Sequence, residues 1–214
     1  MPRPGVKDPY RQQARAQGFV ARAIYKLQDI DGKHRLFRPH DRVLDLGCSP
    51  GSWLQYILSR VGPGGLVVGV DLQPLAIAVA PPLYFLAASV ASLDLAALRA
   101  ICPQFDVIVS DLAPKTTGVR DVDQQRYLEL AGQAWDLARN LLKPGGHFLV
   151  KVFTGPDLPE LVQQLKRQFA AVRRLKQSGS RAASREIYLL GLNRQETPMA
   201  AAASKPAATG SSRR

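Results

Sequence analysis

Charged side chains lie within or directly after several apolar stretches of the sequence. Asp45 lies in VLDL, Asp71 ends LVVGVD, Asp111 ends DVIVSD, and Lys151 lies in FLVKVF. A charge at such a place is costly unless the protein uses it. Ligands of open α/β sheets bind beyond the carboxyl ends of the parallel strands, so we expect these residues to meet at one rim. Glu186 of SREIYLLGL joins them if that last strand runs antiparallel to its neighbours.

The segment after the first of these strands has the composition of a nucleoside-binding loop. Asp45, Gly47 and Gly51 form a D-x-G-x-x-x-G pattern, in which glycines permit a tight turn and close approach of the backbone to a ligand. Asp71 can accept hydrogen bonds from both hydroxyls of a ribose. Either aspartate alone could instead cap a strand end, and Trp53 could pack on a cofactor or join the next helix to the sheet. Together these residues favour a bound nucleoside.

The loop also indicates which nucleoside cofactor is bound. GCSPGSW lacks the G-x-G-x-x-G pattern of dinucleotide sites and the GxxxxGK[ST] pattern of nucleotide triphosphatases. It has no lysine to hold a phosphate. S-adenosylmethionine, a cationic nucleoside without phosphates, suits the acidic surroundings better. A nicotinamide-dependent oxidoreductase on a similar fold is the alternative, which this loop disfavours.

Alternating strands and helices must position these residues. From Arg42 onward we predict strands at VLDL, LVVGVD, YFLAA, DVIVSD and HFLVKVF, with helices at WLQYILSR and QRYLELAGQAWDLARNLL. This alternation predicts an α/β fold of the Rossmann-like type, with a mostly parallel sheet and helices on both faces. AAVRRLK and SREIYLLGL indicate an antiparallel pair at one edge. We therefore expect the main domain to span residues 41–194.

Two segments flank this domain. Residues 1–40 are predicted to be a basic, helical N-terminal extension, with a helix near residues 21–31 in which Ala23, Ile24, Leu27 and Ile30 recur at helical spacing. Residues 195–214 are small and polar with little to bury, so we predict a disordered tail.

The overall charge predicts a polyanionic partner. The chain of 214 residues has 29 Lys and Arg against 17 Asp and Glu, a formal charge of +12. A basic surface without any nucleic-acid role remains the alternative on charge alone.

Composition also argues against several classes of protein. Cys48 and Cys102 are too few for a disulfide framework, which fits a reducing cytoplasm. His34, His40 and His147 show no zinc-binding spacing, so we predict no metal. No signal sequence or membrane-spanning run is apparent, so we expect a cytoplasmic protein without a membrane partner.

Several motifs in order resemble one family. ARAIYKL, DLGCSPGSW, VDLQP, SDLAPKTTG, LVKVFTG and SREIYL, spread over residues 8 to 193, are similar to the FtsJ (RrmJ, RlmE) family of ribosomal RNA large subunit 2'-O-methyltransferases. The resemblance implies a methyltransferase that uses S-adenosylmethionine to methylate a uridine ribose of 23S ribosomal RNA. It implies a catalytic tetrad of Lys26, Asp111, Lys151 and Glu186, and cofactor contacts from Gly51, Trp53, Asp71 and Asp111.

The sequence departs from the family pattern at the third strand. Ser89 stands where the family has an aspartate for the adenine amino group, and Ser52 replaces a common glycine. A serine can accept the same hydrogen bond as a neutral group. We expect weaker adenine recognition from Ser89 and tolerance of Ser52.

Lys151 is the candidate for the transfer step. Its neighbours Val150 and Val152 predict a desolvated amine, which favours a neutral general base. The charge of a nearby Lys26 would also favour the neutral form of Lys151, whereas Asp111 and Glu186 would favour its ammonium form. A charged Lys151 would instead stabilise the developing alkoxide.

Contacts to RNA are expected from the basic residues and one aromatic. Tyr188 could stack or hydrogen-bond near the target nucleotide, or be a half-buried strand tyrosine. The partner is expected to be ribosomal RNA in the assembled large subunit, bound by a monomer. Transfer RNA or messenger RNA caps are alternative substrates, and a noncatalytic ribosome-assembly factor is an alternative function. The basic candidates are Arg11, Arg15, Arg22, Lys33, Arg35, Arg38, Arg181 and Arg185.

Overall fold

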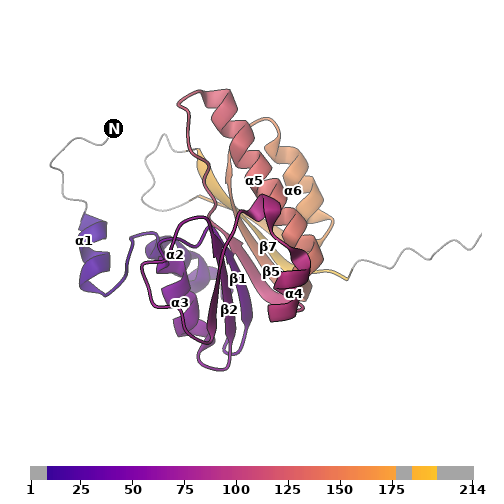
Figure 1. The fold of residues 1–214 in the computed structure, drawn as a ribbon. Coiled ribbons are helices and arrows are strands. Elements are labelled where there is room, and N and C mark those ends of the chain that lie inside the picture. The colour runs from indigo at the N-terminus through magenta and orange to yellow at the C-terminus, as the bar shows by residue number, and fades with distance from the viewer. Residues whose placement is uncertain (1–8, 177–184, 197–214) are drawn as a thin grey trace, which may run out of the picture.

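A seven-stranded sheet forms the centre of the molecule (Figure 1). The computed structural model describes residues 9–176 and 185–196. The strand order is β3-β2-β1-β4-β5-β7-β6. The strands are β1 (Arg42–Leu46), β2 (Leu66–Asp71), β3 (Leu83–Ala87), β4 (Phe105–Ser110), β5 (Leu142–Phe153), β6 (Phe169–Leu175) and β7 (Glu186–Arg194).

The pairing of the strands confirms the predicted sheet. β3, β2, β1, β4 and β5 pair in parallel, whereas β7 pairs antiparallel with both β5 and β6. The antiparallel strand β7 therefore lies second from the edge, and β7 and β6 form the predicted antiparallel pair. Since β7 starts where β5 ends, Glu186 lies opposite Phe153, and Tyr188 lies opposite Lys151.

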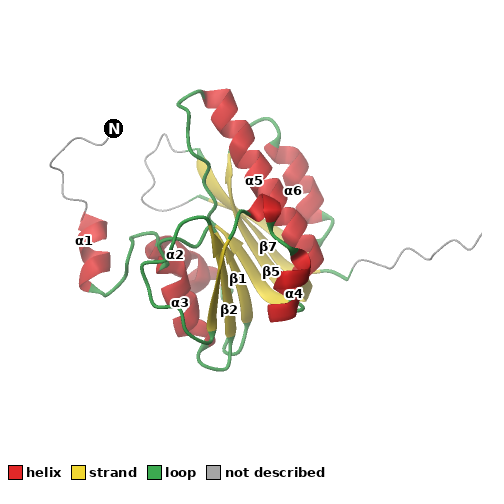
Figure 2. Ribbon diagram, viewed as in Figure 1, coloured by secondary structure: helices red, strands yellow, loops and turns green. Residues whose placement is uncertain are grey.

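Helices cover both faces of the sheet (Figure 2). Apolar residues of α2 and α3 pack on one face, and those of α4, α5 and α6 pack on the other. No described helix combines the length and apolar character that crossing a membrane requires. The helices are α1 (Pro9–Ala16), α2 (Ile24–His34), α3 (Ser52–Val61), α4 (Leu95–Ile101), α5 (Arg120–Leu141) and α6 (Leu158–Lys166), with a 3-10 turn at Val90–Ser92.

α2 is packed as part of the main domain. Ile24 and Leu27 are fully buried, and Asp31 accepts hydrogen bonds from the Tyr56 hydroxyl at 2.7 Å and from Arg60 Nε at 3.1 Å. The helix of the predicted N-terminal extension therefore packs directly on α3. Residues 197–214 of the predicted tail lie outside the described residues.

Candidate active site

Lys151 and Asp111 form the centre of the candidate site, at the carboxyl ends of β5 and β4. Only 7% of Lys151 is exposed. Its Nζ donates to the Asp111 carbonyl oxygen at 2.8 Å and lies 3.1 Å from Asp111 Oδ1. These two contacts fix the position of the amine.

Tyr188 and Trp53 support Asp111 through a chain of contacts. Asp111 Oδ1 accepts a hydrogen bond from the Tyr188 hydroxyl at 2.5 Å. The Tyr188 ring lies 5.9 Å from that of Trp53, whose Nε1 donates to the Ala23 carbonyl at 2.9 Å. The Trp53 ring thus packs α3 against β7, which is the helix-to-sheet role considered for it in the sequence, and its indole nitrogen also joins α3 to the start of α2.

The side chain of Tyr188 is not accessible to RNA in this structure. It is fully buried in the strand, so it matches the strand-tyrosine interpretation rather than nucleotide stacking. Its described role is to hold Asp111. Sequence reasoning placed it at the right edge but gave no signal for this contact, because the run IYLLGL is apolar on both faces.

Lys26 and Glu186 border the same rim without contacting Lys151. Lys26 is half-buried in the first turn of α2, and its side chain makes no hydrogen bond or ion pair with the residues that the structure describes. Glu186 is half-buried at the start of β7 and lines a cavity with Phe153 and Arg185. The structure thus joins two tetrad members directly and places the other two at the edges.

Three aspartates make this rim strongly acidic. Asp45 is completely buried, and neither of its carboxylate oxygens has a hydrogen-bond partner among the described residues. Burial first, and then the charges of Asp111 and Asp71, raise the pKa of Asp45 well above its usual value. A buried acceptor without a donor fits a cationic ligand, and the surrounding charge opposes a phosphate.

The glycine loop is fixed tightly between strand ends. Gly47 has φ +80, and a Cβ there would lie 2.9 Å from the Leu112 backbone nitrogen. Asp71 accepts from the backbone nitrogens of Ser49 at 2.9 Å and Gln73 at 2.8 Å, one at each oxygen. Each oxygen keeps a lone pair for a ribose hydroxyl. Gly51, with φ +115, lies against Ile77.

Ser89 follows β3 next to Asp71. Its Oγ accepts from the Ala91 backbone nitrogen at 3.3 Å, and the preceding Ala88 nitrogen donates to the Asp71 carbonyl at 3.1 Å. Ser89 therefore lies at the rim where the family pattern places an adenine contact.

The predicted RNA-binding residues divide into two groups. The segment before α2 is tied to α3 at the site, since Val20 N donates to Gln55 Oε1 at 3.0 Å, so exposed Arg22 belongs to the rim. Lys33, Arg35 and Arg38 are exposed at the opposite end of α2, which eleven residues place about 16 Å away. Lys33 also pairs with Asp29 at 2.8 Å. Arg11, Arg15 and Arg185 are exposed as well, and Arg181 lies outside the described residues.

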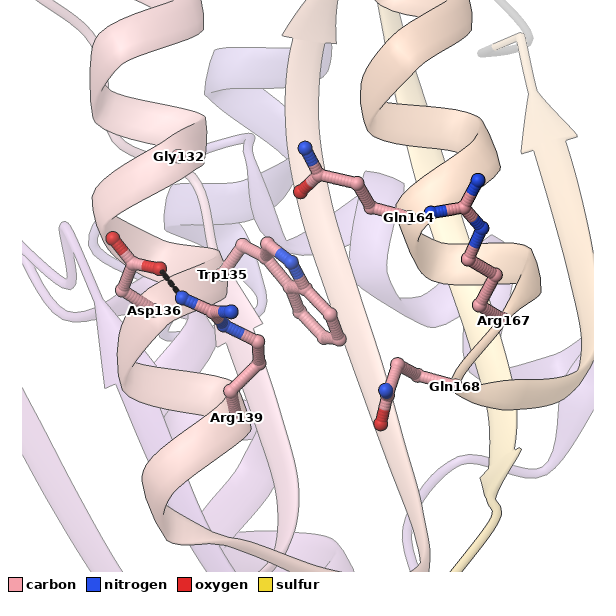
Figure 3. Close-up of a pocket in the computed structure, with 7 residues that line it drawn as sticks. All are labelled: Gly132, Trp135, Asp136, Arg139, Gln164, Arg167 and Gln168. Carbon is pink, nitrogen blue, oxygen red and sulfur yellow. Dashed lines mark hydrogen bonds and ion pairs between the residues drawn. The ribbon is translucent and has the colours of Figure 1, made fainter. Parts of the chain in front are cut away.

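A cavity lies away from this rim, between the second half of α5 and the end of α6 (Figure 3). It has a volume of about 560 Å³ and contains none of the candidate site residues. Its exposed Arg139 is paired with Asp136. A smaller cavity, of about 400 Å³, lies beside Glu186 and adjoins the site.

Comparison with known proteins identifies relatives over most of the chain. The FtsJ-like methyltransferase family matches residues 19–194. Ribosomal RNA large subunit methyltransferase E of Bdellovibrio bacteriovorus is 41% identical over 192 residues, covering 88% of this chain and 97% of that protein. The protein of the same name from Syntrophobacter fumaroxidans is 42% identical over 188 residues, covering 87% of this chain and 95% of that one. A solved structure of a ribosomal RNA methyltransferase from Plasmodium falciparum superposes with a TM-score of 0.72 at 28% identity, over 82% of this chain and 98% of that one.

Proposed function

The chain belongs to the FtsJ-like methyltransferase family, and from this premise we propose that it methylates the 2'-hydroxyl of a uridine in 23S ribosomal RNA with S-adenosylmethionine. We further propose that it acts as a monomer on the assembled large subunit. The observation that supports this most is the buried Lys151, held by Asp111 next to the unpaired carboxylate of Asp45.

The acidic rim fits S-adenosylmethionine. When bound, the cofactor supplies an electrophilic methyl group on a positively charged sulfonium. Asp71 would hold the ribose hydroxyls, Ser89 the adenine, and Asp45 with Asp111 the cationic part. The backbone of Gly47 and Gly51 would lie against the cofactor, because both glycines have a positive φ that permits the tight turn of this loop.

Lys151 is positioned to act on the RNA hydroxyl. An ammonium group has three hydrogen-bond donors, and Lys151 directs its Nζ to two oxygens of Asp111. The remaining donor can reach the 2'-oxygen as negative charge develops there, which stabilises the transition state without reorganisation. The hydroxyl proton is lost to water as the oxygen–methyl bond forms and the methyl–sulfur bond breaks. Tyr188 and Trp53 support this arrangement from behind Asp111, and Lys26 and Glu186 complete the tetrad at the RNA side.

Ser89→Asp should tighten cofactor binding. The new carboxylate can keep the bond from Ala91 N with one oxygen and offer the other to the adenine amino group as a charged acceptor. We expect a gain of about 1 kcal/mol, roughly fivefold in Kd, measured by calorimetry. Ser92→Asp adds the same charge to the same turn and serves as the control; an equal gain from Ser92→Asp would assign the effect to charge alone.

RNA affinity should fall steeply with salt, whereas cofactor affinity should change little, because phosphate contacts release counterions. Arg22 lies at the rim, and Arg38 lies beyond the far end of α2. Arg22→Gln should therefore reduce the salt slope, which is the slope of log K for RNA binding against log salt concentration, by about 1. Arg38→Gln should reduce it by less. Filter binding of large-subunit RNA between low and physiological salt measures both. Equal slopes for RNA and cofactor would contradict the proposed basic surface.

Mapping 2'-O-methylated nucleotides in a strain without the gene tests the substrate. The proposal expects loss of one methylated uridine in 23S RNA, with transfer RNA unchanged. Complementation with the Lys151→Ala variant, which should not restore the methyl group, separates catalysis from a noncatalytic role in ribosome assembly.

A further inference from the structure

A cavity beside Glu186 has the form of a ligand pocket that the proposed mechanism does not yet use. It has a volume of about 400 Å³ and lies between the end of β5 and the start of α5, within the size range of about 300 to 1,000 Å³ typical of small-ligand sites. Its lining comprises Gly118, Arg120, Asp123, Gln124, Phe153, Arg185 and Glu186.

One wall of the pocket is held rigidly by Asp123. Its carboxylate accepts from the backbone nitrogen of Thr117 at 2.7 Å, the Thr117 hydroxyl at 2.9 Å and the backbone nitrogen of Gly118 at 3.0 Å. These bonds, the Thr117 backbone bond first, lower the pKa of Asp123. The Asp123 carboxylate therefore binds the loop at Thr117 and Gly118, and this wall of the pocket forms without a ligand.

An aromatic surface and two cations face the pocket. Tyr127 stacks on Phe153 with ring centroids 3.7 Å apart and planes 17° apart. Phe153 is only partly buried where it lines the cavity, so the exposed part of its ring is available to a flat ligand. Arg120 and Arg185 are exposed there, and neither guanidinium bonds to an acidic group among residues 9–176 and 185–196.

Gln124 offers the polar contact. Its side-chain amide makes no hydrogen bond within the described part of the chain. It lies so close to Gly155 that a Cβ there would be 1.9 Å from Gln124 Nε2. Gly155 therefore makes room for an amide whose donor and acceptor are available to the edge of a base.

The pocket is also next to the reactive amine. Phe153 lies two residues beyond Lys151 on β5, and Lys151 Nζ lies 5.9 Å from the Tyr127 ring centroid. The larger cavity of Figure 3 lacks the exposed aromatic ring and the nearby amine: its Trp135 is 3% exposed, and its Arg139 is already paired.

From these contacts we propose that the pocket binds the nucleotide that presents its 2'-hydroxyl to Lys151. The base stacks on Phe153 and hydrogen-bonds to Gln124, while Arg120 and Arg185 bind the flanking phosphates. This inference rests on the proposed function and adds to it how the target nucleotide is held outside the RNA stack.

Steady-state methylation of a 23S RNA fragment that contains the mapped nucleotide tests the pocket. Phe153→Leu should raise the KM for RNA by about 5- to 150-fold, the range for loss of one stacked base, with the Kd for S-adenosylmethionine unchanged. Gln124→Met keeps the side-chain length but loses donor and acceptor, and should raise the RNA KM several-fold. Arg185→Gln should also lower the salt slope by about 1. Arg167→Gln, an exposed arginine beside the larger cavity, is the matched control.

Photocrosslinking gives a reading that does not depend on folding of the variants. RNA with 4-thiouridine at the target position should crosslink the unmutated protein within the peptide that carries Phe153 or the one that carries Gln124. Crosslinks confined to other peptides, or variants that behave like Arg167→Gln, would overturn the pocket assignment. If the unmutated protein methylates no RNA, the proposed function itself fails, which is a separate outcome.

Discussion

Lys151→Ala should lower the single-turnover rate of methyl transfer by about 10²- to 10⁴-fold, the range for loss of a catalytic acid, base or charge stabiliser. The buried amine contacts the Asp111 oxygens and faces the Tyr127 ring, and in the proposed mechanism its removal takes away the donor to the reacting oxygen. Binding of cofactor and RNA should survive. Single-turnover rates at saturating cofactor and RNA isolate the chemical step.

Asp71→Ala provides the contrast to this variant. Asp71 is assigned to ribose hydroxyls that do not react, so its loss should raise the Kd for cofactor and leave the saturated rate close to that of the unmutated protein. A Lys151→Ala protein that transfers methyl groups at the normal rate would refute the assignment, and Lys26 would then be the next residue to test.

Asp45→Asn should weaken cofactor binding by about 2 kcal/mol or more, roughly 30-fold, because it removes a buried charge opposite a cationic ligand. The same substitution should stabilise the cofactor-free protein. Since the folded protein raises the pKa of Asp45, the folded state binds more protons than the unfolded state above about pH 4. Stability is therefore lost as the pH rises through that window.

Urea unfolding without cofactor measures the second effect. At neutral pH, Asp45→Asn should raise the free energy of unfolding by about 1 to 3 kcal/mol, the cost of an unsatisfied buried group, and the gain should shrink towards pH 4. Asp94→Asn is the control, because Asp94 caps α4 through Ala96 N and asparagine caps equally well. A gain that does not change with pH would exclude ionisation of Asp45 as its cause.

The sheet and its rim could be predicted from the sequence because the apolar runs that form the strands contain or end in charged residues. LVVGVD forms β2 with the predicted ends, and the antiparallel direction of the last strand brought Glu186 to the end of β5. α6 was missed although Leu158, Leu161, Val162 and Leu165 recur at helical spacing and are all buried. KPGG reads as a turn, yet it lies within β5, where the pairing with β4 shifts register.

Contacts between distant elements could not be predicted from the sequence. The Tyr188 hydroxyl reaches Asp111, which is 77 residues away, and no local pattern encodes that contact. The basic residues around α2 carry no local signal that separates them, but the direction of the helix places Arg22 and Arg38 beyond its opposite ends. Asp123 carries no signal beyond its place in a helix start, because its three partners depend on the path of the preceding loop.

Locating the transferred methyl group on the RNA shows whether the protein is a 2'-O-methyltransferase. Purified protein, methyl-labelled S-adenosylmethionine and large ribosomal subunits are incubated, and the RNA is hydrolysed with alkali. A 2'-O-methyl group blocks cleavage at the following phosphate, so the account predicts that the label appears in an alkali-resistant dinucleotide that begins with a methylated uridine. Label released with mononucleotides, as a base methylation would give, would contradict it.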